Sequence, residues 1–354
     1  MTLQGGIRVG LVGYGLAGRS FHAPFIDAVD GLHLAVVATS DPGRAARAAA
    51  EHPGAEVVGG VEELLDHSDI DLVVVATPNR SHVPIACQAF AAGRHVVVDK
   101  PIAMDIAEAE RLIGAATAAG RLLSVFQNRR WDGDFMTLRQ LVAEDALGSI
   151  DSLEARFERS SPVGPEWRES ALEAGGPLRD LGSHLVDQSL ILFGPARRVW
   201  AQVDRRRPGT QVDDSVFVAI DHASGVRSRL WTSLIALREG PRLRVRGLAG
   251  EYVKEDLDVQ EAQLVGGMRP SEPGFGEEPP ERFGRLYGMD GSVSRVPTEP
   301  GRYRTFYELM RDAIRGDGPV PVDPTDSLAV LAVLEAAERA ASSGSAQIVS
   351  ESWA

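Results

Sequence analysis

Cysteine is almost absent from this chain of 354 residues, because Cys87 is the only one. A single thiol cannot form a disulfide within the chain, and its place in the apolar run 84–90 predicts a small buried side chain. The sequence therefore excludes a disulfide framework and favours a reducing, cytoplasmic compartment.

Positive charge and long apolar runs are scarce as well. Lys and Arg number 37 against 50 Asp and Glu, which leaves a net charge of −13, and the short run 205–207 is typical of a solvated strand end. Such an acidic chain repels phosphate backbones and anionic lipid surfaces, so we expect neither nucleic acid nor a membrane as a partner. The first apolar stretch, 7–12, is much shorter than the roughly 20 residues of a membrane span. It also lacks a basic lead and a cleavage site, so we expect neither a membrane anchor nor a secretory signal.

From residue 7 to residue 126 the chain alternates regularly between short apolar runs and Ala-rich stretches. Apolar runs spaced by helices are typical of a parallel sheet covered on both faces, so we expect an α/β fold with a doubly wound Rossmann sheet. The predicted strands are 7–12, 32–38, 55–58, 71–76, 95–98 and 122–126, and the predicted helices are 42–52, 61–67, 83–92 and 105–119.

After residue 126 the pattern predicts helices and a large open, mostly antiparallel sheet with one wet face. We expect strands at 150–159, 198–203, 215–221, 226–233 and 242–246, and helices at 134–144, 180–193, 303–315 and 327–342. The Gly-, Pro- and Glu-rich segment 270–280 predicts an irregular loop that is either a lid or an oligomer contact. We expect a first domain over 1–125 and a second over 126–354, with ligands bound in the cleft between them.

A glycine-rich turn follows the first strand and leads into a helical segment, as a dinucleotide-binding site requires. Gly13 permits the tight turn, Gly15 lets a pyrophosphate approach the backbone, and Gly18 lets the helix pack on the sheet. A turn without a ligand is the alternative. The predicted cofactor-binding residues here are Gly13, Tyr14, Gly15, Leu16, Ala17 and Gly18.

Polar residues also follow the strands 32–38 and 71–76. Asp41, with Ser40, is suited to accept hydrogen bonds from an adenosine ribose, and a turn that starts the next helix is the alternative. Cofactor contact is also expected just after the strand 71–76. The alternative for Asn79 there is that it is the N-cap of the next helix. The residues concerned there are Thr77, Pro78 and Asn79.

Lys100 comes just after the strand 95–98, between Asp99 and Pro101. Because proline stiffens the backbone, the ammonium of Lys100 is positioned to hold a substrate oxygen inside the cleft. An exposed surface lysine is the alternative. Asp99 and Lys100 are also assigned to the cofactor site.

Asp180 and His184 are four residues apart at the start of the helix predicted over 180–193, which puts them on one face. The pair suits acid–base chemistry, and a helix cap with a nearby polar residue is the alternative. No third ligand lies at a useful spacing and the HExxH motif is absent, so we expect no metal site.

Arg129 and Trp131, just past the last parallel strand, and Trp167 in the loop PEWRES are candidates for the wall of a substrate pocket. A guanidinium can hold two hydroxyls, and an aromatic plate can cover the C–H face of a sugar ring. For the segment 128–132, a salt-bridge knot between the domains is the alternative.

Together, the segments GYGLAGRSFHAP, TPNRSH, DKP, QNRRWDGDF and GGPLRDLGSH resemble the family of glucose-fructose oxidoreductase, inositol dehydrogenase and rhizopine catabolism proteins (Gfo/Idh/MocA). The likeness is strongest to the NADP-dependent scyllo-inositol 2-dehydrogenase branch. It implies an N-terminal Rossmann domain and a C-terminal α/β domain whose open sheet builds a homodimer or homotetramer.

The resemblance also assigns individual residues. Lys100 matches the lysine of the family's EKP motif, while Asp180 and His184 match its Asp and His. His82 of TPNRSH joins the cofactor site. Asp99 stands where Glu is usual, and the family often has a cis peptide bond before the proline that follows Lys100.

These residues predict reversible hydride transfer between a nicotinamide cofactor and a secondary alcohol of a cyclic polyol or sugar. His184 would act as general base, because an imidazole takes and returns a proton near neutral pH. Asp180 would orient it, and Lys100 would stabilise negative charge on the substrate oxygen. The alternatives are a dinucleotide-binding sensor without turnover, and elimination or glycoside cleavage with a tightly bound cofactor.

The segment Thr39–Ser40–Asp41 departs from the Thr-Ser-Arg that the NADP-dependent relatives tend to have. A carboxylate repels a 2′-phosphate and accepts hydrogen bonds from both ribose hydroxyls, so we expect NAD to be preferred. Arg44, one helical turn further on, could reach a 2′-phosphate together with Ser40, which keeps NADP as the alternative.

Overall fold

The computed structural model describes residues 6–349 apart from 161–168 and 174, and the chain divides into two compact units. The N-terminal unit comprises Met1–Asn128, Gln260–Phe275 and Arg302–Pro324, and the C-terminal unit comprises Arg129–Val259, Gly276–Gly301 and Thr325–Ala354. Two late segments thus pack with the first 128 residues, which the sequence pattern did not indicate. The domain limits 1–125 and 126–354 stay a prediction.

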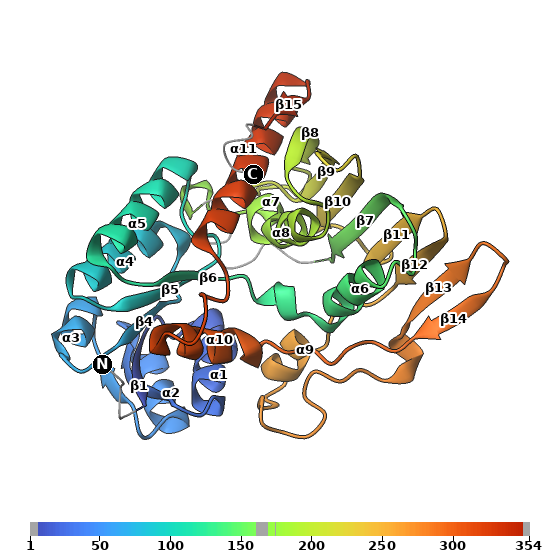
Figure 1. Ribbon diagram of the computed structural model, residues 1–354. Helices are drawn as coiled ribbons and strands as arrows, with labels where there is room; N and C mark the ends of the chain where they lie inside the picture. The colour runs from blue at the N-terminus through green and yellow to red at the C-terminus, as the bar shows by residue number, and fades with distance from the viewer. Residues whose placement is uncertain (1–5, 161–168, 174, 350–354) are drawn as a thin grey trace. The chain divides into compact units, whose positions relative to one another are not determined.

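The N-terminal unit is built on a six-stranded sheet in the order β3-β2-β1-β4-β5-β6 (Figure 1). All of its neighbouring strands pair in parallel. Its core is made of Val, Leu and Ile side chains that are buried on both faces of the central strands. The strands are β1 (Ile7–Val12), β2 (Leu32–Ala38), β3 (Glu56–Val58), β4 (Leu72–Val75), β5 (His95–Asp99) and β6 (Leu123–Phe126).

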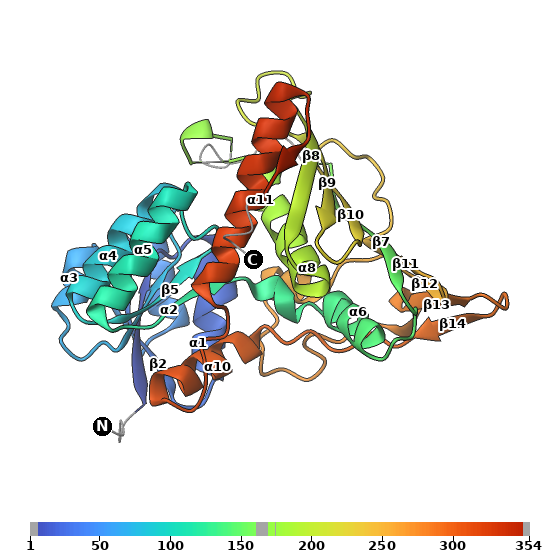
Figure 2. The ribbon, with the colours of Figure 1, turned by 45° about the horizontal axis from the view of Figure 1, so that its top comes forward.

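Helices cover both faces of this sheet, which confirms the predicted doubly wound α/β fold. Figures 1 and 2 show α4 and α5 together on one face, with α1 and α10 on the other. After β1 the chain forms a π-helix, η1 (Ala17–His22), that runs directly into α1. The helices are α1 (Ala23–Ala28), α2 (Pro42–Glu51), α3 (Val61–Asp66), α4 (His82–Ala91), α5 (Ile106–Ala119), α9 (Gln260–Val265) and α10 (Arg304–Arg315).

The C-terminal unit is built on a nine-stranded sheet in the order β14-β13-β12-β11-β7-β10-β9-β8-β15. All neighbouring strands are antiparallel except β7 and β10, so the prediction of a mostly antiparallel sheet is confirmed. The strands are β7 (Ile150–Glu158), β8 (Ala196–Asp204), β9 (Ser215–His222), β10 (Arg227–Ser233), β11 (Leu243–Gly247), β12 (Gly250–Lys254), β13 (Gly284–Gly288), β14 (Val293–Val296) and β15 (Gln347–Ile348).

Four of these strands, β12 to β15, were not predicted. Of these, β13 is mostly half-buried and β14 is mostly exposed, while β15 has only two residues. All three lack the alternation of apolar and polar residues that identifies a half-buried strand. The helices of this unit are α6 (Gly133–Ala143), α7 (Pro177–Asp180), α8 (Gly182–Phe193) and α11 (Pro324–Ser343). Alternate residues of β9 are buried, as expected for a sheet with one covered face.

Two predictions about single features can be compared directly with the structure. Segment 270–280 is irregular as expected, because only turns and bends lie between α9 and the short helix η5 (Pro280–Arg282). Cys87 is half-buried on α4 rather than fully buried, and burial raises the pKa of its thiol. Among the described residues, no helix is long and apolar enough to cross a membrane.

Candidate active site

The glycine-rich turn after β1 has the shape of a dinucleotide cradle. Gly13 has a φ of +98°, and a Cβ atom there would collide with the carbonyl oxygen of Ala76. A Cβ on Gly18 would collide with the carbonyl oxygen of Gly13. Gly15 is open by contrast, because within the described part of the chain the only atom less than 4 Å from such a Cβ is Nη1 of Arg44, at 3.7 Å. The turn therefore leaves room for a ligand at Gly15 and fits a pyrophosphate.

Tyr14 has a structural side chain. It is 1% exposed, and its hydroxyl donates a hydrogen bond to Glu51 at 2.7 Å, while Arg19 pairs with the same carboxylate at 2.6 Å. Burial, and then the hydrogen bond to Glu51, raise the pKa of Tyr14 above its ordinary value. The side chain thus ties the turn to α2, so the predicted cofactor contact would fall to its backbone. Leu16 and Ala17 are exposed and half-buried, respectively.

Asp41 is the N-cap of α2. Its side chain accepts a hydrogen bond from the Arg44 N–H at 2.8 Å, and Pro42 follows as the first helical residue. The alternative of a helix start is therefore correct for the fold, and the ribose contact stays a prediction. Ser40 and Asp41 are both exposed.

The loop after β4 contributes a buried hydroxyl. The Oγ1 atom of Thr77 is buried and has no hydrogen-bond partner among the residues that the structure describes. Such an orphaned group at the carboxyl end of a parallel strand suits a polar ligand. The N-cap of η2 (Asn79–Ser81) is Pro78, so the alternative of an Asn79 N-cap is wrong.

His82 is committed to the protein backbone. Its ring is 1% exposed, with Nε2 2.9 Å from the carbonyl oxygen of Thr77 and Nδ1 2.8 Å from that of Pro101. The ring thus links the loops that follow β4 and β5. Both nitrogens of His82 face carbonyl oxygens, and its part in cofactor binding stays a prediction.

Lys100 follows β5 directly, and the Lys100–Pro101 peptide bond is cis, as the resemblance implied. The carboxylate of Asp99 accepts a hydrogen bond from the Lys100 N–H at 2.8 Å. The sequence contains only one other lysine, Lys254, which is fully buried and pairs with Glu278 at 3.0 Å. Half-buried Lys100 is therefore the lysine of this chain that a ligand can reach.

Asp180 and His184 belong to the C-terminal unit, whereas Lys100 belongs to the N-terminal unit. The prediction of one helix over 180–193 is wrong, since Asp180 ends α7 and His184 lies in the first turn of α8. The His184 N–H bonds to the Leu181 carbonyl at 3.2 Å, a three-residue step that tightens the chain at the junction. His184 is 5% exposed. That it acts on one substrate with Lys100 stays a prediction.

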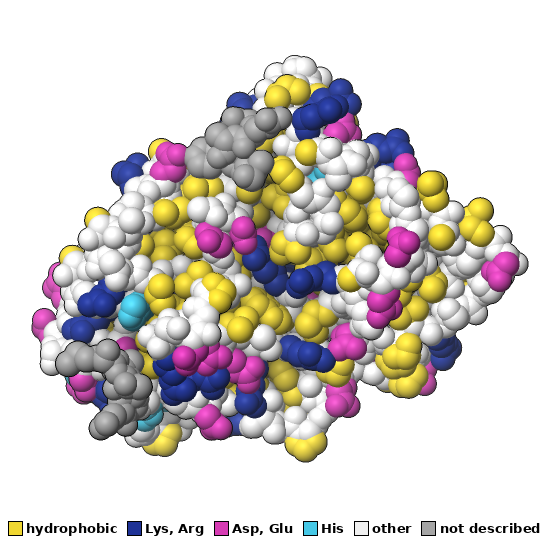
Figure 3. Space-filling model, in the orientation of Figure 1, with side chains coloured by type: hydrophobic (Ala, Val, Ile, Leu, Met, Phe, Trp, Pro, Cys, Tyr) yellow, Lys and Arg dark blue, Asp and Glu magenta, His cyan; other side chains and the backbone are white. Residues whose placement is uncertain are grey.

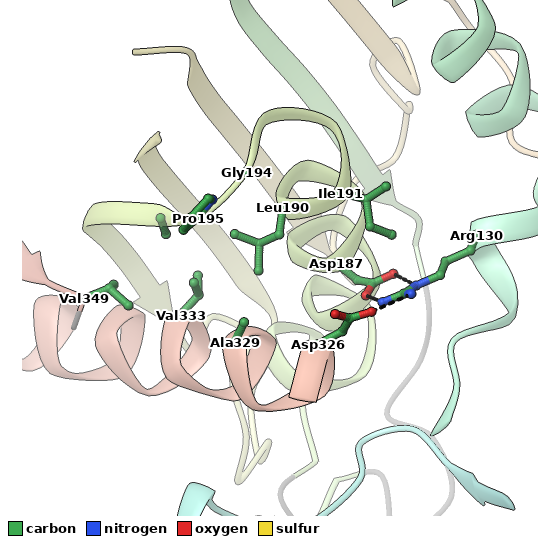
Figure 4. A pocket seen from close by; sticks show the side chains of 11 residues that line it. Arg130, Asp187, Leu190, Ile191, Gly194, Pro195, Asp326, Ala329, Val333 and Val349 are labelled. Carbon is green, nitrogen blue, oxygen red and sulfur yellow. Dashed lines mark hydrogen bonds and ion pairs between the residues drawn. The ribbon is translucent and has the colours of Figure 1, made fainter. Parts of the chain in front are cut away.

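Arg130 ties two helices of the C-terminal unit together (Figure 4). Its Nε and Nη2 atoms lie 2.9 and 2.6 Å from Asp187 of α8, and Nη1 lies 2.9 Å from Asp326 of α11. Burial raises the pKa of Asp187. This ion-pair cluster closes one end of a pocket of about 190 Å³ with apolar walls that include Leu190 and Val333. The salt-bridge knot considered for 128–132 thus exists, but within one unit.

The predicted wall of the substrate pocket is described in part. Arg129 is 6% exposed, with Nη1 3.3 Å from Asp132 and its guanidinium 4.7 Å from the centre of the Phe157 ring. This placement favours a structural role for Arg129. Trp131 is half-exposed at the end of η3 (Asn128–Trp131), and Trp167 lies outside the described residues.

Charged side chains of both signs lie side by side over the face drawn in Figure 3, and no extended basic patch is visible there. Among the described residues, no group of three His, Cys, Asp or Glu side chains could hold a metal ion.

Comparison with known proteins agrees with the fold and the glycine cradle. Residues 7–127 match the family described as "Oxidoreductase family, NAD-binding Rossmann fold" (GFO_IDH_MocA), and residues 135–253 match the "GFO/IDH/MocA C-terminal domain". The uncharacterized oxidoreductase YdgJ of Escherichia coli K12 is 39% identical over 93% of this chain and 94% of that protein. IolW of Bacillus subtilis 168, a scyllo-inositol 2-dehydrogenase (NADP⁺), is 35% identical over 94% of this chain and 92% of that protein. The crystal structure of an oxidoreductase from Bacillus cereus superposes with a TM-score of 0.86 at 26% identity, covering 97% of this chain and 99% of that one.

Proposed function

The chain belongs to the Gfo/Idh/MocA family of nicotinamide-binding oxidoreductases, and from this premise we propose that it transfers a hydride to or from a secondary alcohol of a cyclic polyol or sugar. The proposal draws on two relatives, the scyllo-inositol 2-dehydrogenase IolW and, at 29% identity over 62% of this chain, a D-glucoside 3-dehydrogenase of Escherichia coli K12. When bound, the nicotinamide ring supplies the hydride acceptor or donor.

One observation carries this proposal: three groups suited to a dinucleotide and its substrate lie at one sheet edge. Since β1, β4 and β5 are neighbouring parallel strands, the open backbone of Gly15, the orphaned hydroxyl of Thr77 and the ammonium of Lys100 all follow carboxyl ends at that edge. Ligands of open α/β sheets bind there. The N-terminal unit thus offers both a pyrophosphate cradle and a cation for a substrate oxygen.

In the proposed reaction, loss of a carbon-bound hydride requires loss of the hydroxyl proton as well. His184 takes that proton as the general base, because an imidazole exchanges a proton readily near neutral pH. Asp180 orients His184 or holds a neighbouring hydroxyl. Lys100 stabilises the negative charge that grows on the substrate oxygen. Trp131 and Trp167 are the proposed pocket wall, whereas the buried contacts of Arg129 give it a structural role instead of the wall position expected from the sequence.

We propose NAD as the better cofactor, supported by the exposed carboxylate of Asp41 just past β2. A 2′-phosphate would meet this negative charge, whereas two ribose hydroxyls would find an acceptor. Arg44 is the group that would favour NADP, because its guanidinium lies beside Gly15. The proposed compartment is the cytoplasm, on the grounds that the chain has one cysteine.

We also propose a homodimer or homotetramer formed through the open sheet of the C-terminal unit. Half-exposed aromatic rings form a stripe across β8, β9 and β10, with Trp200 5.9 Å and Trp231 4.9 Å from Phe217 between ring centres. Such stripes are typical of interface cores. Light scattering of the purified protein should give at least a dimer, and Phe217→Glu should shift it towards the monomer; a monomeric wild type contradicts this assembly.

The decisive experiment is a substrate panel. The purified enzyme is incubated with inositols, pentoses, hexoses and their lactones, each with NAD and with NADP, and the absorbance of reduced nicotinamide is followed. We expect oxidation of at least one cyclic polyol or sugar. Consumption of a substrate without net reduction would point to elimination or glycoside cleavage, and dinucleotide binding with no turnover at all would point to a sensor.

A further inference from the structure

A buried histidine and a buried tyrosine meet next to the Asp99–Lys100 segment. His22, the last residue of η1, is 0% exposed, and its Nδ1 atom lies 2.6 Å from the hydroxyl of Tyr307. Tyr307 belongs to α10, 285 residues further along the chain, and is also 0% exposed. The segment Arg302–Pro324 of the N-terminal unit thus contributes the Tyr307 hydroxyl as the hydrogen-bond partner of His22.

Aromatic rings surround this pair and keep water away from it. The ring centre of Phe126, at the end of β6, lies 4.3 Å from that of His22, and Phe306 lies 4.8 Å from Phe126. Polar interactions inside such an apolar shell are stronger than in water, because the effective dielectric constant is low.

The other nitrogen of His22 faces a carboxylate. Its Nε2 atom is 3.8 Å from Oδ2 of Asp99 and makes no hydrogen bond among the described residues. Burial alone raises the pKa of Asp99, but the interactions with His22, and then with Lys100 and His82, outweigh burial and hold that pKa below its ordinary value. Asp99 is therefore ionised.

For a neutral imidazole, only one of the two tautomers suits all three groups. Burial, followed by the charge of Asp99, raises the pKa of Tyr307 well above its ordinary value, so the hydroxyl keeps its proton. If the hydroxyl donates to Nδ1 of His22, the imidazole proton sits on Nε2 and points to the Asp99 carboxylate. The opposite tautomer would turn a lone pair of Nε2 towards an anion.

We propose that His22 and Tyr307 are positioning residues that act through Asp99 on Lys100. The Tyr307 hydroxyl selects the His22 tautomer with its proton on Nε2, and this N–H holds the Asp99 carboxylate ionised in one orientation. The other oxygen of that carboxylate accepts the backbone N–H of Lys100, so the charge beside the Lys100 side chain depends on the pair. The inference rests on the proposed function for the statement that Lys100 binds the substrate oxygen.

The role of His22 and Tyr307 can be tested by chemical labelling of Lys100, which does not depend on catalysis. The chain has only two lysines, and the other, Lys254, is buried and ion-paired, so the labelling of Lys100 can be followed separately. Trinitrobenzenesulfonate reacts with amines, so mass spectrometry of the Lys100 peptide reports on the surroundings of the Lys100 side chain. We expect Tyr307→Phe and His22→Leu to speed labelling of Lys100 about threefold or more at fixed pH. Either change removes a group that holds the Asp99 carboxylate ionised and in place beside Lys100. His22→Gln keeps an N–H near the position of Nε2 and should restore most of the wild-type rate.

The matched control is Tyr303→Phe. Tyr303 is equally buried, lies immediately before α10 and packs edge-on against Phe25 at 6.1 Å instead of against His22. Its loss of a buried hydroxyl should leave the labelling rate of Lys100 unchanged. Circular dichroism of each variant verifies that it folds.

Turnover of scyllo-inositol with NAD or NADP gives the second reading. We expect kcat to fall about tenfold in Tyr307→Phe and His22→Leu, with the dissociation constant of the dinucleotide within about twofold of wild type. Unchanged labelling of Lys100 in both folded variants would overturn the inference. Faster labelling in a protein that oxidises no polyol or sugar would leave the inference standing and remove the proposed function.

Discussion

The two compact units keep their polar groups in different places. In the N-terminal unit they gather where parallel strands end, and the backbone supplies many of their partners: His82 lies between two carbonyl oxygens, and Asp99 accepts an N–H. In the C-terminal unit charged side chains are buried against one another. Arg242 is 3% exposed and contacts Asp134 at 3.1 Å and Gln188 at 2.9 Å.

This difference follows from the two kinds of sheet. Parallel strands all end at one edge, where loop backbone atoms and helix starts can satisfy polar groups without burying charge. The mixed sheet of the C-terminal unit has helices on one face, so a charge placed there must find its opposite inside the core. The first arrangement leaves groups available to a ligand, and the second makes each buried charge depend on its partner.

The largest expected effect comes from breaking a buried pair. Arg242→Met leaves the fully buried Asp134 without its cation, and we expect a loss of about 3 to 5 kcal/mol in the free energy of unfolding. The N-terminal ranges contain no tryptophan, so the tryptophan fluorescence measured in urea reports on the C-terminal unit.

The matched change in the other unit is Arg19→Met, which removes the partly exposed pair with Glu51. The free energy of unfolding of this variant should fall by no more than about 1 kcal/mol. Unfolding in urea is followed here by circular dichroism. Equal losses in the two variants would show that the units do not differ in this way.

The next effect concerns turnover. Lys100→Met and His184→Ala should each lower kcat by about 10² or more, because one loses a positive charge at the substrate oxygen and the other loses the base. The dissociation constant of the dinucleotide, measured by fluorescence of the reduced nicotinamide, should change little. Near wild-type turnover in both variants would rule out the proposed roles.

A smaller effect is expected at the sheet edge of the N-terminal unit. Asp41→Arg should shift the ratio of kcat/KM for NAD over NADP by about tenfold towards NADP, because a guanidinium replaces a carboxylate at the ribose. Arg44→Ala is the companion variant. A wild type that prefers NADP and loses that preference in Arg44→Ala would reassign the phosphate site to Ser40 and Arg44.

The last effect is a pH dependence in the C-terminal unit. Burial raises the pKa of Asp213 to about 6, and its carboxylate accepts the Leu178 N–H at 2.8 Å. The folded state therefore binds a proton more tightly than the unfolded chain, and this stabilisation disappears as the pH rises from about 4 through 6. Asp213→Asn keeps the acceptor and loses the titration.

Thermal unfolding at pH 4 and at pH 7 checks this sign. Relative to Asp213→Asn, the wild type should lose about 2 kcal/mol between pH 4 and pH 7. Parallel pH profiles of the two proteins would mean that Asp213 has an ordinary pKa in the folded state.

Much of the N-terminal unit could be predicted from local pattern. The strands of the parallel sheet are short, apolar and separated by helices, and Gly13 is required wherever a chain turns this tightly with positive φ. The division of 180–193 into α7 and α8 could not be predicted, because the sequence there has continuous helical periodicity and the break is a single turn residue, Leu181.

By itself, then, the sequence determined the doubly wound sheet, the glycine cradle, the position of Lys100 at a strand end and the family to which the chain belongs. These features depend on residues that are neighbours along the chain. Only the tertiary structure decided that Tyr307 meets His22, that Asp187 and Asp326 share Arg130, and that Gly15 lies open beside Arg44. Packing alone brings such distant residues together. A local sequence pattern therefore cannot predict which buried polar groups will pair.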